Sequence, residues 1–530
     1  MVLRSKAPIA VLVAALLLTV LPQGLWGGDA RATGNPFVGI QWYADPGSAV
    51  ARQATAWRGT RPGDAALLDL IAREQSVEWF GGWLDDNTLS SFVDRHVTQI
   101  AKAGGTPIMA VYNIPYRDCG KYSAGGANDP AHYRAWIARF ARALGTRKAI
   151  IILEPDGLTV TECLSPALVQ ERYALIGEAV GTFKRSNPNV AVYIDGGDNK
   201  RNTVGEIVGI LNAANIAQAD GFFLNSTVYQ YASTEVAYGR EVGAALGEKH
   251  FVVDTSRNGL GPAGDIWCNA PGRALGVAPT TRTGEPLADA FIWLKPVWQS
   301  DGHCERGEPD AGQNHWDYAL KLAQRSLQPF TDVPTLNPSG GNEEWVTAIQ
   351  ALTLRGVIRG SGDGTVGASS TTLRAQMAAL IARPNYWERE SAGNKFTDQG
   401  AVDRDLWRNV GVLANYKVAK GFGDGTFGPT DPVLYSQVIL FISRAMVQKG
   451  YWQLQPDNAT YFPNLLATTA QQQADRRDIA TYVHYTQQAG GVPDRPATAA
   501  FVGWDRPAPR SWFAVALYRA LLSAPGYLGK

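Results

Sequence analysis

The chain has little of what metal sites and nucleic-acid binding require. It contains four cysteines and six widely spaced histidines, and neither a CxxC nor an HExxH pattern occurs in its 530 residues. This pattern does not indicate a zinc site, and we expect neither a metal nor a cofactor. The 49 Lys and Arg residues nearly balance the 48 Asp and Glu residues, so the formal net charge is only +1. That balance gives no electrostatic reason to expect nucleic acid or an anionic membrane as a partner, and it suits an uncharged substrate.

Long apolar runs are also scarce. One occurs, IAVLVAALLLTVL, and it follows Arg4 and Lys6 and precedes the small-x-small sequence Ala30-Arg31-Ala32. A run of this length is short for a membrane span, so the pattern predicts a cleaved signal peptide over residues 1–32 rather than an uncleaved anchor. We therefore expect a secreted chain without a transmembrane segment.

If the chain is exported, its four cysteines can form disulfides, because disulfides persist in oxidising compartments. These residues are Cys119, Cys163, Cys268 and Cys304, and the sequence contains no cysteine after position 304. We expect them to form disulfides, but the sequence alone leaves three pairings open.

Up to about residue 327, strand-like and helix-like segments alternate. The strand-like runs are 37–43, 106–113, 149–155, 190–196, 221–225, 251–256 and 289–296. Between them, segments such as AHYRAWIARFARALG repeat apolar residues at intervals of three and four, which is typical of helices. This alternation predicts a parallel α/β barrel or a doubly wound sheet.

Beyond residue 328 the composition changes and the sequence repeats itself. FTD at 330–332 recurs at 396–398, and GVIRGSGDGTVG is echoed by VAKGFGDGTFG. A third copy is weaker, with YFPN at 461–464 and then RPAPRSWFAVALYRAL. A fixed period predicts a structural array, here with repeats at about 329–385, 394–447 and 460–523.

Three aspartates follow strand-like runs in the first part of the chain. Asp118 ends VYNIPYRD, Asp156 lies in IILEPDGL, and Asp301 comes after FIWLKPVWQS. The carboxyl ends of parallel strands meet on one face of an α/β barrel, where catalytic residues lie. Carboxylates placed there suit glycoside hydrolysis.

Six motifs in order carry a family resemblance over roughly residues 34–327. They are VYNIPYRDC, LEPDGL, VYIDGG, VDTSRNGLGP, WCNAPGRALG and WLKPVWQSDG. Together they resemble glycoside hydrolase family 6, the inverting cellulases. The resemblance implies a distorted seven-stranded parallel β/α barrel over residues 33–327 that hydrolyses cellulose or a related β-1,4-glucan.

The resemblance also implies roles for the residues of the site. Asp156 matches the general acid, and Asp118 the carboxylate that keeps the acid protonated and stabilises charge. Asp301 matches the proposed base, and Tyr112 the tyrosine that crowds the sugar at the cleavage point. Structural alternatives are a helix cap for Asp156, a salt bridge with Arg117 for Asp118, and an ordinary barrel-lining role for Tyr112.

Further matches concern substrate binding and the disulfides. Trp79 and Trp267 resemble sugar-stacking platforms, and Lys295 and Asp195 match cleft residues, although a structural role for Asp195 is equally compatible. The family pairs Cys119 with Cys163 and Cys268 with Cys304, each pair bracing a loop that carries an active-site aspartate.

The chain departs from the family at three positions. Asp198 and Arg201 replace a histidine and a tryptophan, which leaves an acceptor platform in doubt, and Gln299 replaces a glutamate beside the expected base. The loops after Cys119 and Asp301 are short, which favours an open cleft and internal cleavage. The alternatives are an exo-acting cellobiohydrolase and a catalytically weak glucan- or wall-binding protein.

The second part, residues 328–530, resembles three S-layer homology repeats, which implies a mostly α-helical domain that binds secondary polymers of the bacterial cell wall or S-layer. Arg374 in TLRAQ matches the arginine of the family's TRAE motif, and Arg510 is its counterpart in the third repeat. A guanidinium there would bind an anionic carbohydrate. The alternative is a packing module without a ligand.

Overall fold

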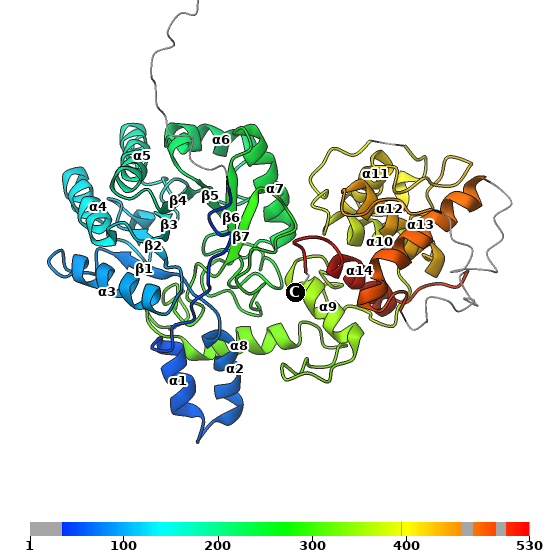
Figure 1. Ribbon diagram of the computed structural model, residues 1–530, viewed down its shortest axis with the longest axis horizontal. Coiled ribbons are helices and arrows are strands. Elements are labelled where there is room, and N and C mark those ends of the chain that lie inside the picture. Colours follow the sequence, from blue (N-terminus) through cyan, green and yellow to red (C-terminus); the bar gives the residue numbers. More distant parts are fainter. Residues whose placement is uncertain (1–33, 394, 457–469, 494–504, 529–530) are drawn as a thin grey trace, which may run out of the picture. The chain divides into compact units, whose positions relative to one another are not determined.

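Figure 1 shows a computed structural model of the chain, which describes residues 34–393, 395–456, 470–493 and 505–528. The chain divides into two compact units, Met1–Asn35 and Pro36–Lys530, and the description below concerns the second. The predicted signal peptide (1–32) and the YFPN sequence of the third repeat lie outside the described residues.

Within the second unit, the first region is the part up to residue 327, and the second region is the part from residue 328. The described part of the first region is built on a seven-stranded sheet whose neighbouring strands pair in parallel and in sequence order. The sheet curls so that its two ends approach each other. Val77 N–H, just before the first strand, donates to the carbonyl of Trp293, just after the last strand, at 3.0 Å. The seven parallel strands form a curled half-barrel, which is consistent with the predicted α/β barrel. The strands are β1 (Glu78–Gly81), β2 (Ile108–Tyr112), β3 (Ala149–Leu153), β4 (Val190–Asp195), β5 (Gly221–Leu224), β6 (His250–Asp254) and β7 (Ala288–Ile292).

One predicted strand was wrong. Residues 37–43 form turns and irregular backbone, and β1 takes the place of that strand in the sheet. Gly39 has a φ of 70°, a conformation that interrupts extended backbone. The apolar character of the run has another cause, since Phe37 and Ile40 are buried in the cluster inside the barrel. Strand β1 was not predicted from the sequence because it has only four residues, and one of them is the charged Glu78.

The apolar runs of the strands supply two separate cores. Alternate side chains point to opposite faces of a strand, so Ile150 and Ile152 of β3 join the cluster inside the barrel. Ile151 and Leu153 join the larger cluster between the sheet and its helices. Burial on both faces explains why β3 is hydrophobic throughout.

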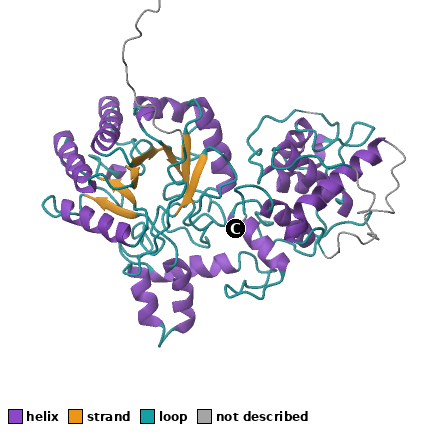
Figure 2. Ribbon diagram, viewed as in Figure 1, coloured by secondary structure: helices purple, strands orange, loops and turns teal. Residues whose placement is uncertain are grey.

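Helices cover the outside of the curled sheet in Figure 2. Local signals start several of them: the side chains of Asp129 and Ser165 accept hydrogen bonds from the first turns of α4 and α5, with proline at the next position. The helices of this region are α1 (Ala49–Trp57), α2 (Pro62–Ala72), α3 (Leu89–Lys102), α4 (Pro130–Leu144), α5 (Pro166–Ser186), α6 (Val204–Ala213), α7 (Ala232–Ala245) and α8 (Trp316–Leu327).

The described part of the second region is helical, with α9 (Glu344–Leu354), α10 (Arg374–Ala382), α11 (Arg404–Asn415), α12 (Tyr435–Gln448), α13 (Ala470–Thr486) and α14 (Arg510–Leu522). The two FTD sequences have the same structural role. The Asp332 carboxylate accepts from the backbone N–H groups of Val366 and Gly367, and Asp398 accepts from those of Phe427 and Gly428. The sequence repeat therefore corresponds to a repeated hydrogen-bond pattern.

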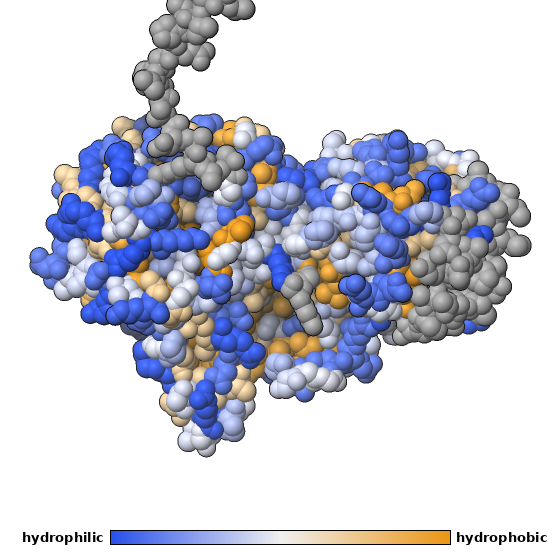
Figure 3. Space-filling view, in the orientation of Figure 1, coloured by the Kyte–Doolittle hydropathy of each residue, from blue (hydrophilic) through white to orange (hydrophobic). Residues whose placement is uncertain are grey.

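Hydrophilic side chains cover much of the face drawn in Figure 3, with smaller hydrophobic patches between them. Among the described residues, no helix combines the length and the apolar character that a membrane crossing requires.

Candidate active site

A cavity of about 1020 Å³ lies at the carboxyl ends of the strands and contains most of the predicted site. Asp195 is the one predicted catalytic or substrate-binding residue that does not line it. Those that do are Trp79, Tyr112, Asp118, Asp156, Trp267, Lys295 and Asp301. Residues separated by more than 200 positions therefore meet in one place, as the topology of a parallel barrel requires.

Asp156 stands two residues beyond Glu154, which directly follows β3. Both residues have positive φ values, 61° and 54°, and the tight turn at this point directs the Asp156 side chain to the cavity wall. Its carboxylate is 3.5 Å from the Thr227 hydroxyl and 3.7 Å from Nη1 of Arg201. The Asp156 side chain is only 19% exposed, so it is largely shielded from water but remains accessible from the cavity.

Burial raises the pKa of Asp156 to about 7, and the charges of nearby Asp195 and Asp118 add to the effect. Arg201 acts in the opposite direction, because its positive charge favours the ionised carboxylate. A carboxyl group with this pKa holds a proton for a large fraction of the time near neutral pH, which is the property that a general acid requires.

Glu154, which was not among the residues predicted for the site, fixes the strand ends. Its buried carboxylate accepts hydrogen bonds from the backbone N–H groups of Asn113 and Ile114, just after β2, at 2.9 to 3.0 Å. Burial raises the pKa of Glu154 to about 7. The residue lies in the same LEPDGL motif as Asp156, but only the fold reveals that its partners follow the neighbouring strand.

Tyr112 and Asp118 occupy the wall beside Asp156. The Tyr112 ring, at the end of β2, meets the Trp79 ring edge-to-face at 5.1 Å and lies 4.4 Å from the Arg117 guanidinium. Asp118 accepts from Ser123 N–H at 2.9 Å, and burial raises its pKa. Arg117 donates to backbone carbonyls, including that of Tyr112.

Asp195, at the end of β4, is 1% exposed and supports the loop that follows Asp156. Its carboxylate accepts from the N–H groups of Leu158 and Thr159, the Thr159 hydroxyl and Gly197 N–H. These contacts match the structural role that the sequence left open, since they occupy the carboxylate within the protein.

Asp301 is buried in a cage of opposite charge. Its oxygens lie 2.7 Å from Nη1 of Arg257 and 3.0 Å from Nζ of Lys295, and one accepts from Asn269 N–H. Burial alone would raise the pKa of Asp301, but the two cations outweigh it and hold the pKa at about 2. Asp301 is therefore ionised across the pH range in which Asp156 titrates. Arg257 was missed because its partner lies 44 residues away in sequence.

The two aromatic residues that the sequence predicts as sugar platforms, Trp79 and Trp267, line the cavity. The indole N–H of Trp79 donates to the Leu294 carbonyl at 2.7 Å, which fixes its ring. Trp267 is 39% exposed and lies 5.9 Å from the Tyr122 ring.

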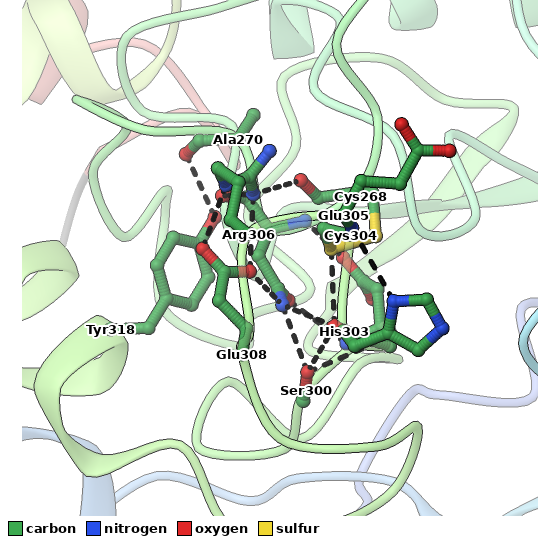
Figure 4. The surroundings of a disulfide bond; sticks show 12 residues. Cys268, Ala270, Ser300, His303, Cys304, Glu305, Arg306, Glu308 and Tyr318 are labelled. Carbon is green, nitrogen blue, oxygen red and sulfur yellow. Dashed lines mark hydrogen bonds and ion pairs between the residues drawn. A yellow bond between two sulfur atoms is a disulfide. The ribbon is translucent and has the colours of Figure 1, made fainter.

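Disulfides join Cys119 to Cys163 and Cys268 to Cys304, the two pairs that the resemblance implies. Figure 4 shows the second pair and its surroundings. There the Arg306 guanidinium donates to the Cys268 carbonyl at 2.9 Å and pairs with Glu308. This network ties the segment that carries Trp267 to the one that carries Asp301.

The departures from the family pattern acquire definite positions. The Asp198 carboxylate accepts from the backbone N–H groups of Lys200 and Arg201, which shapes a tight turn. That turn directs Arg201 to Thr159 and Asp156, at 3.3 and 3.7 Å. Gln299 lines the cavity.

The two arginines singled out in the second region are engaged by the chain itself. Arg374 is 3% exposed, donates to the Phe427 carbonyl at 2.8 Å and lies over the Phe422 and Phe427 rings. Arg510 donates to the Val366 carbonyl and to the Gln376 side chain.

The barrel, its paired carboxylates and its aromatic walls define a glycoside hydrolase. Comparisons with known proteins identify the family: the model of glycosyl hydrolases family 6 matches residues 37–326, and the chain belongs to that family. The S-layer homology domain matches residues 395–439.

Similar proteins include Endoglucanase A of Thermobispora bispora, 39% identical over 309 residues, which are 57% of this chain and 66% of that protein. Endoglucanase 1 of Streptomyces halstedii is 38% identical over 53% of this chain and 88% of its own length. Among solved structures, the endoglucanase Cel6 from Mycobacterium tuberculosis, in complex with a thio-linked cellobioside, is 38% identical. It aligns with a TM-score of 0.54 over 56% of this chain and 100% of that chain.

Proposed function

We propose that the protein is a secreted cellulase that hydrolyses internal β-1,4-glucosidic bonds with inversion and is held at the bacterial cell surface by its C-terminal region. The observation that carries the proposal is the pairing, on one cavity, of a carboxyl group with a pKa of about 7 and a carboxylate with a pKa of about 2. Environments that push two carboxyl pKa values apart are typical of an acid and an anion with separate roles.

In this mechanism Asp156 protonates the glycosidic oxygen as the bond breaks. The negative charges of Asp118, Asp195 and Asp198 oppose its ionisation, so the proton is still present near neutral pH. Asp118 also lies on the cavity wall, where its charge stabilises the positive charge that develops on the sugar. Tyr112 stands beside both and crowds the sugar at the point of cleavage.

Inversion requires an attacking water on the opposite face of the sugar, with a carboxylate to direct it. We assign this role to Asp301. A carboxylate with a pKa of about 2 has little affinity for a proton. We therefore place a second water between Asp301 and the attacking one, and the fixed negative charge of Asp301 polarises this short chain. As the attacking oxygen bonds to the anomeric carbon, the glycosidic bond breaks and the leaving oxygen keeps the proton from Asp156. The proton that the attacking water loses passes through the second water to solvent.

Internal cleavage is favoured by the relatives. Those named endoglucanase are 36% to 39% identical, whereas a relative named 1,4-beta-D-glucan cellobiohydrolase, from Podospora anserina, is 28% identical. Exo-cleavage remains the second candidate, because the barrel and its carboxylates serve either mode and only the loops differ.

Attachment to the cell wall or S-layer is supported by the S-layer homology match at 395–439 and by the three repeats predicted from the sequence. A secondary cell-wall polymer is the proposed partner. Arg374 and Arg510 remain the proposed wall-binding residues. Their hydrogen bonds to Phe427 and Val366 support a packing role as well.

The test follows viscosity and reducing ends together on a soluble β-1,4-glucan. We expect the unaltered chain to reduce viscosity early, and Asp156→Ala to lose activity by about 10² or more, since general-acid catalysis contributes 10²–10⁴-fold. Lys200→Gln is a matched control, because Lys200 is an exposed neighbour that pairs with Asp265 rather than with the acid.

Cellobiose release without a fall in viscosity would establish exo-cleavage instead. Absence of hydrolysis in both proteins would favour the catalytically weak binding protein and implicate Gln299.

A further inference from the structure

The cavity that holds Asp156 extends past Trp79 to a group of residues with no assigned role. Its lining also includes Glu78 of β1, Trp83 just after β1, and Phe92 and His96 of α3. A smaller cavity of about 180 Å³ is lined by these same residues and Trp79. The catalytic cleft therefore runs beyond its recognised aromatic wall and along β1.

The position of Trp83 depends on a glycine. A Cβ atom on Gly81 would come within 2.4 Å of the Trp83 ring and 2.6 Å of the Tyr112 carbonyl oxygen. The indole lies against the strand end because Gly81 has no side chain. It remains 54% exposed, 6.5 Å from the Tyr112 ring. A large aromatic side chain is thus held beside the residue at the cleavage point, with the Arg117 guanidinium 5.3 Å from its ring.

Phe92 supplies a second exposed aromatic face. It lies in the first turn of α3 and is 42% exposed. Arg95 approaches its ring at 4.5 Å. Two aromatic faces that remain open to solvent on the border of one cavity suit a ligand with apolar faces of its own.

The polar groups that line the same cavity are suited to an uncharged ligand. The Glu78 carboxyl contacts solvent, but the cavity walls surround it, so burial raises its pKa to about 7 with a contribution from Asp45. Burial lowers the pKa of His96 to about 4, so its ring is neutral at neutral pH. Within the described residues its Nε2 atom is buried and has no hydrogen-bond partner. Aromatic walls with a few placed polar groups are typical of small-molecule and sugar sites.

We propose that Trp83, Phe92, Glu78 and His96, here called the Trp83 shelf, form an additional glucosyl-binding subsite that extends the cleft beyond Trp79. The occupant is the β-1,4-glucan that the cleft cleaves, because the shelf and Asp156 line the same cavity. Its aromatic rings would contact the C–H faces of a glucose unit, and the Glu78 carboxyl would bind hydroxyl groups. The inference rests on the proposed function. An enzyme that cuts a glucan internally must leave room for the glucan to continue beyond the cleavage point.

The test measures how kcat/KM rises with substrate length from cellotetraose to cellohexaose. We expect Trp83→Ala to reduce the cellohexaose-to-cellotetraose ratio about tenfold, which corresponds to ~1.4 kcal/mol. Phe92→Ala is expected to reduce it less. Leu454→Ala, an exposed apolar residue of the second region, is the control and should keep the ratio of the unaltered chain. Unchanged ratios in both shelf variants would overturn the proposal.

Calorimetric titration separates the shelf from catalysis. In an Asp156→Ala background, affinity for the same oligosaccharides should increase with length, and adding Trp83→Ala should remove that increase. If the unaltered chain hydrolyses nothing but this length dependence is present, the proposed function fails while the shelf stands. If affinity is independent of length with Trp83 intact, the shelf is wrong. Trp83→Phe should restore part of the increase, which distinguishes stacking from a folding defect.

Discussion

The barrel and the C-terminal region both bury charged side chains, but they use them differently. In the barrel, Asp301 is enclosed by Arg257 and Lys295 while one side of the cluster meets a cavity. In the C-terminal region, Arg374 and Arg510 are satisfied by carbonyl groups of their own chain. A buried charge next to a cavity is available to a ligand, whereas a buried charge among backbone carbonyls mainly holds segments together. A buried charged side chain therefore indicates chemistry in the barrel and packing in the C-terminal region.

The largest effect is expected from breaking the ion cluster of the barrel. Arg257→Leu leaves the Asp301 carboxylate with one neighbouring cation, Lys295, and the Asn269 N–H, and removing one partner of a buried pair costs about 3–5 kcal/mol. We expect thermal unfolding of the catalytic region at a clearly lower temperature, together with loss of hydrolysis. Arg58→Leu, which removes an exposed pair with Asp69, is the control. An equal, small shift in both variants would contradict the view that the cluster is structural as well as catalytic.

A smaller stability effect is expected from Arg374→Leu in the C-terminal region. Loss of the hydrogen bond to Phe427 and of the stacking on its ring should lower the free energy of unfolding of this region by about 1–3 kcal/mol. Differential scanning calorimetry checks the shift, and a pull-down on purified cell walls measures binding. If wall binding is lost while the transition is unchanged, Arg374 is a ligand-binding residue and the comparison between the regions fails.

The third effect concerns pH and sharpens the role of Arg201 in the barrel. Its positive charge favours ionised Asp156, so Arg201→Gln should raise the pKa of the acid. Because Asp156 acts in its protonated form, the alkaline limb of the kcat/KM profile should move to higher pH. Lys200→Gln, its exposed neighbour, should leave the limb in place. A limb that moves to lower pH, or not at all, would show that Arg201 does not act on the acid.

The sequence anticipated most of the barrel because its strands are continuous apolar runs between amphipathic helices. It failed at the first strand for a definable reason. The apolar run at 37–43 is buried inside the barrel without pairing, and the short β1 pairs without being apolar throughout. Burial and strand pairing are different constraints, and periodicity reports only the first.

Only part of the site was predicted, because local sequence patterns reveal some of its residues and not others. Asp118, Asp156 and Asp301 are close to strand ends, and strand ends can be read from the chain. Arg257 and Glu154 lie in the VDTSRNGLGP and LEPDGL motifs. They act through partners 44 and about 41 residues away, so the motifs alone do not show which groups these side chains contact.

The sequence by itself determined the order of strands and helices apart from the first strand, the repeated FTD segments, and the cysteines and aspartates that the site uses, because these depend on local patterns. Only the tertiary structure decided the rest. It placed Arg201 against Asp156, enclosed Asp301 between two cations and extended the cleft to Trp83. A pKa and a cavity are properties of the surroundings, and those surroundings are assembled from segments that the chain keeps far apart.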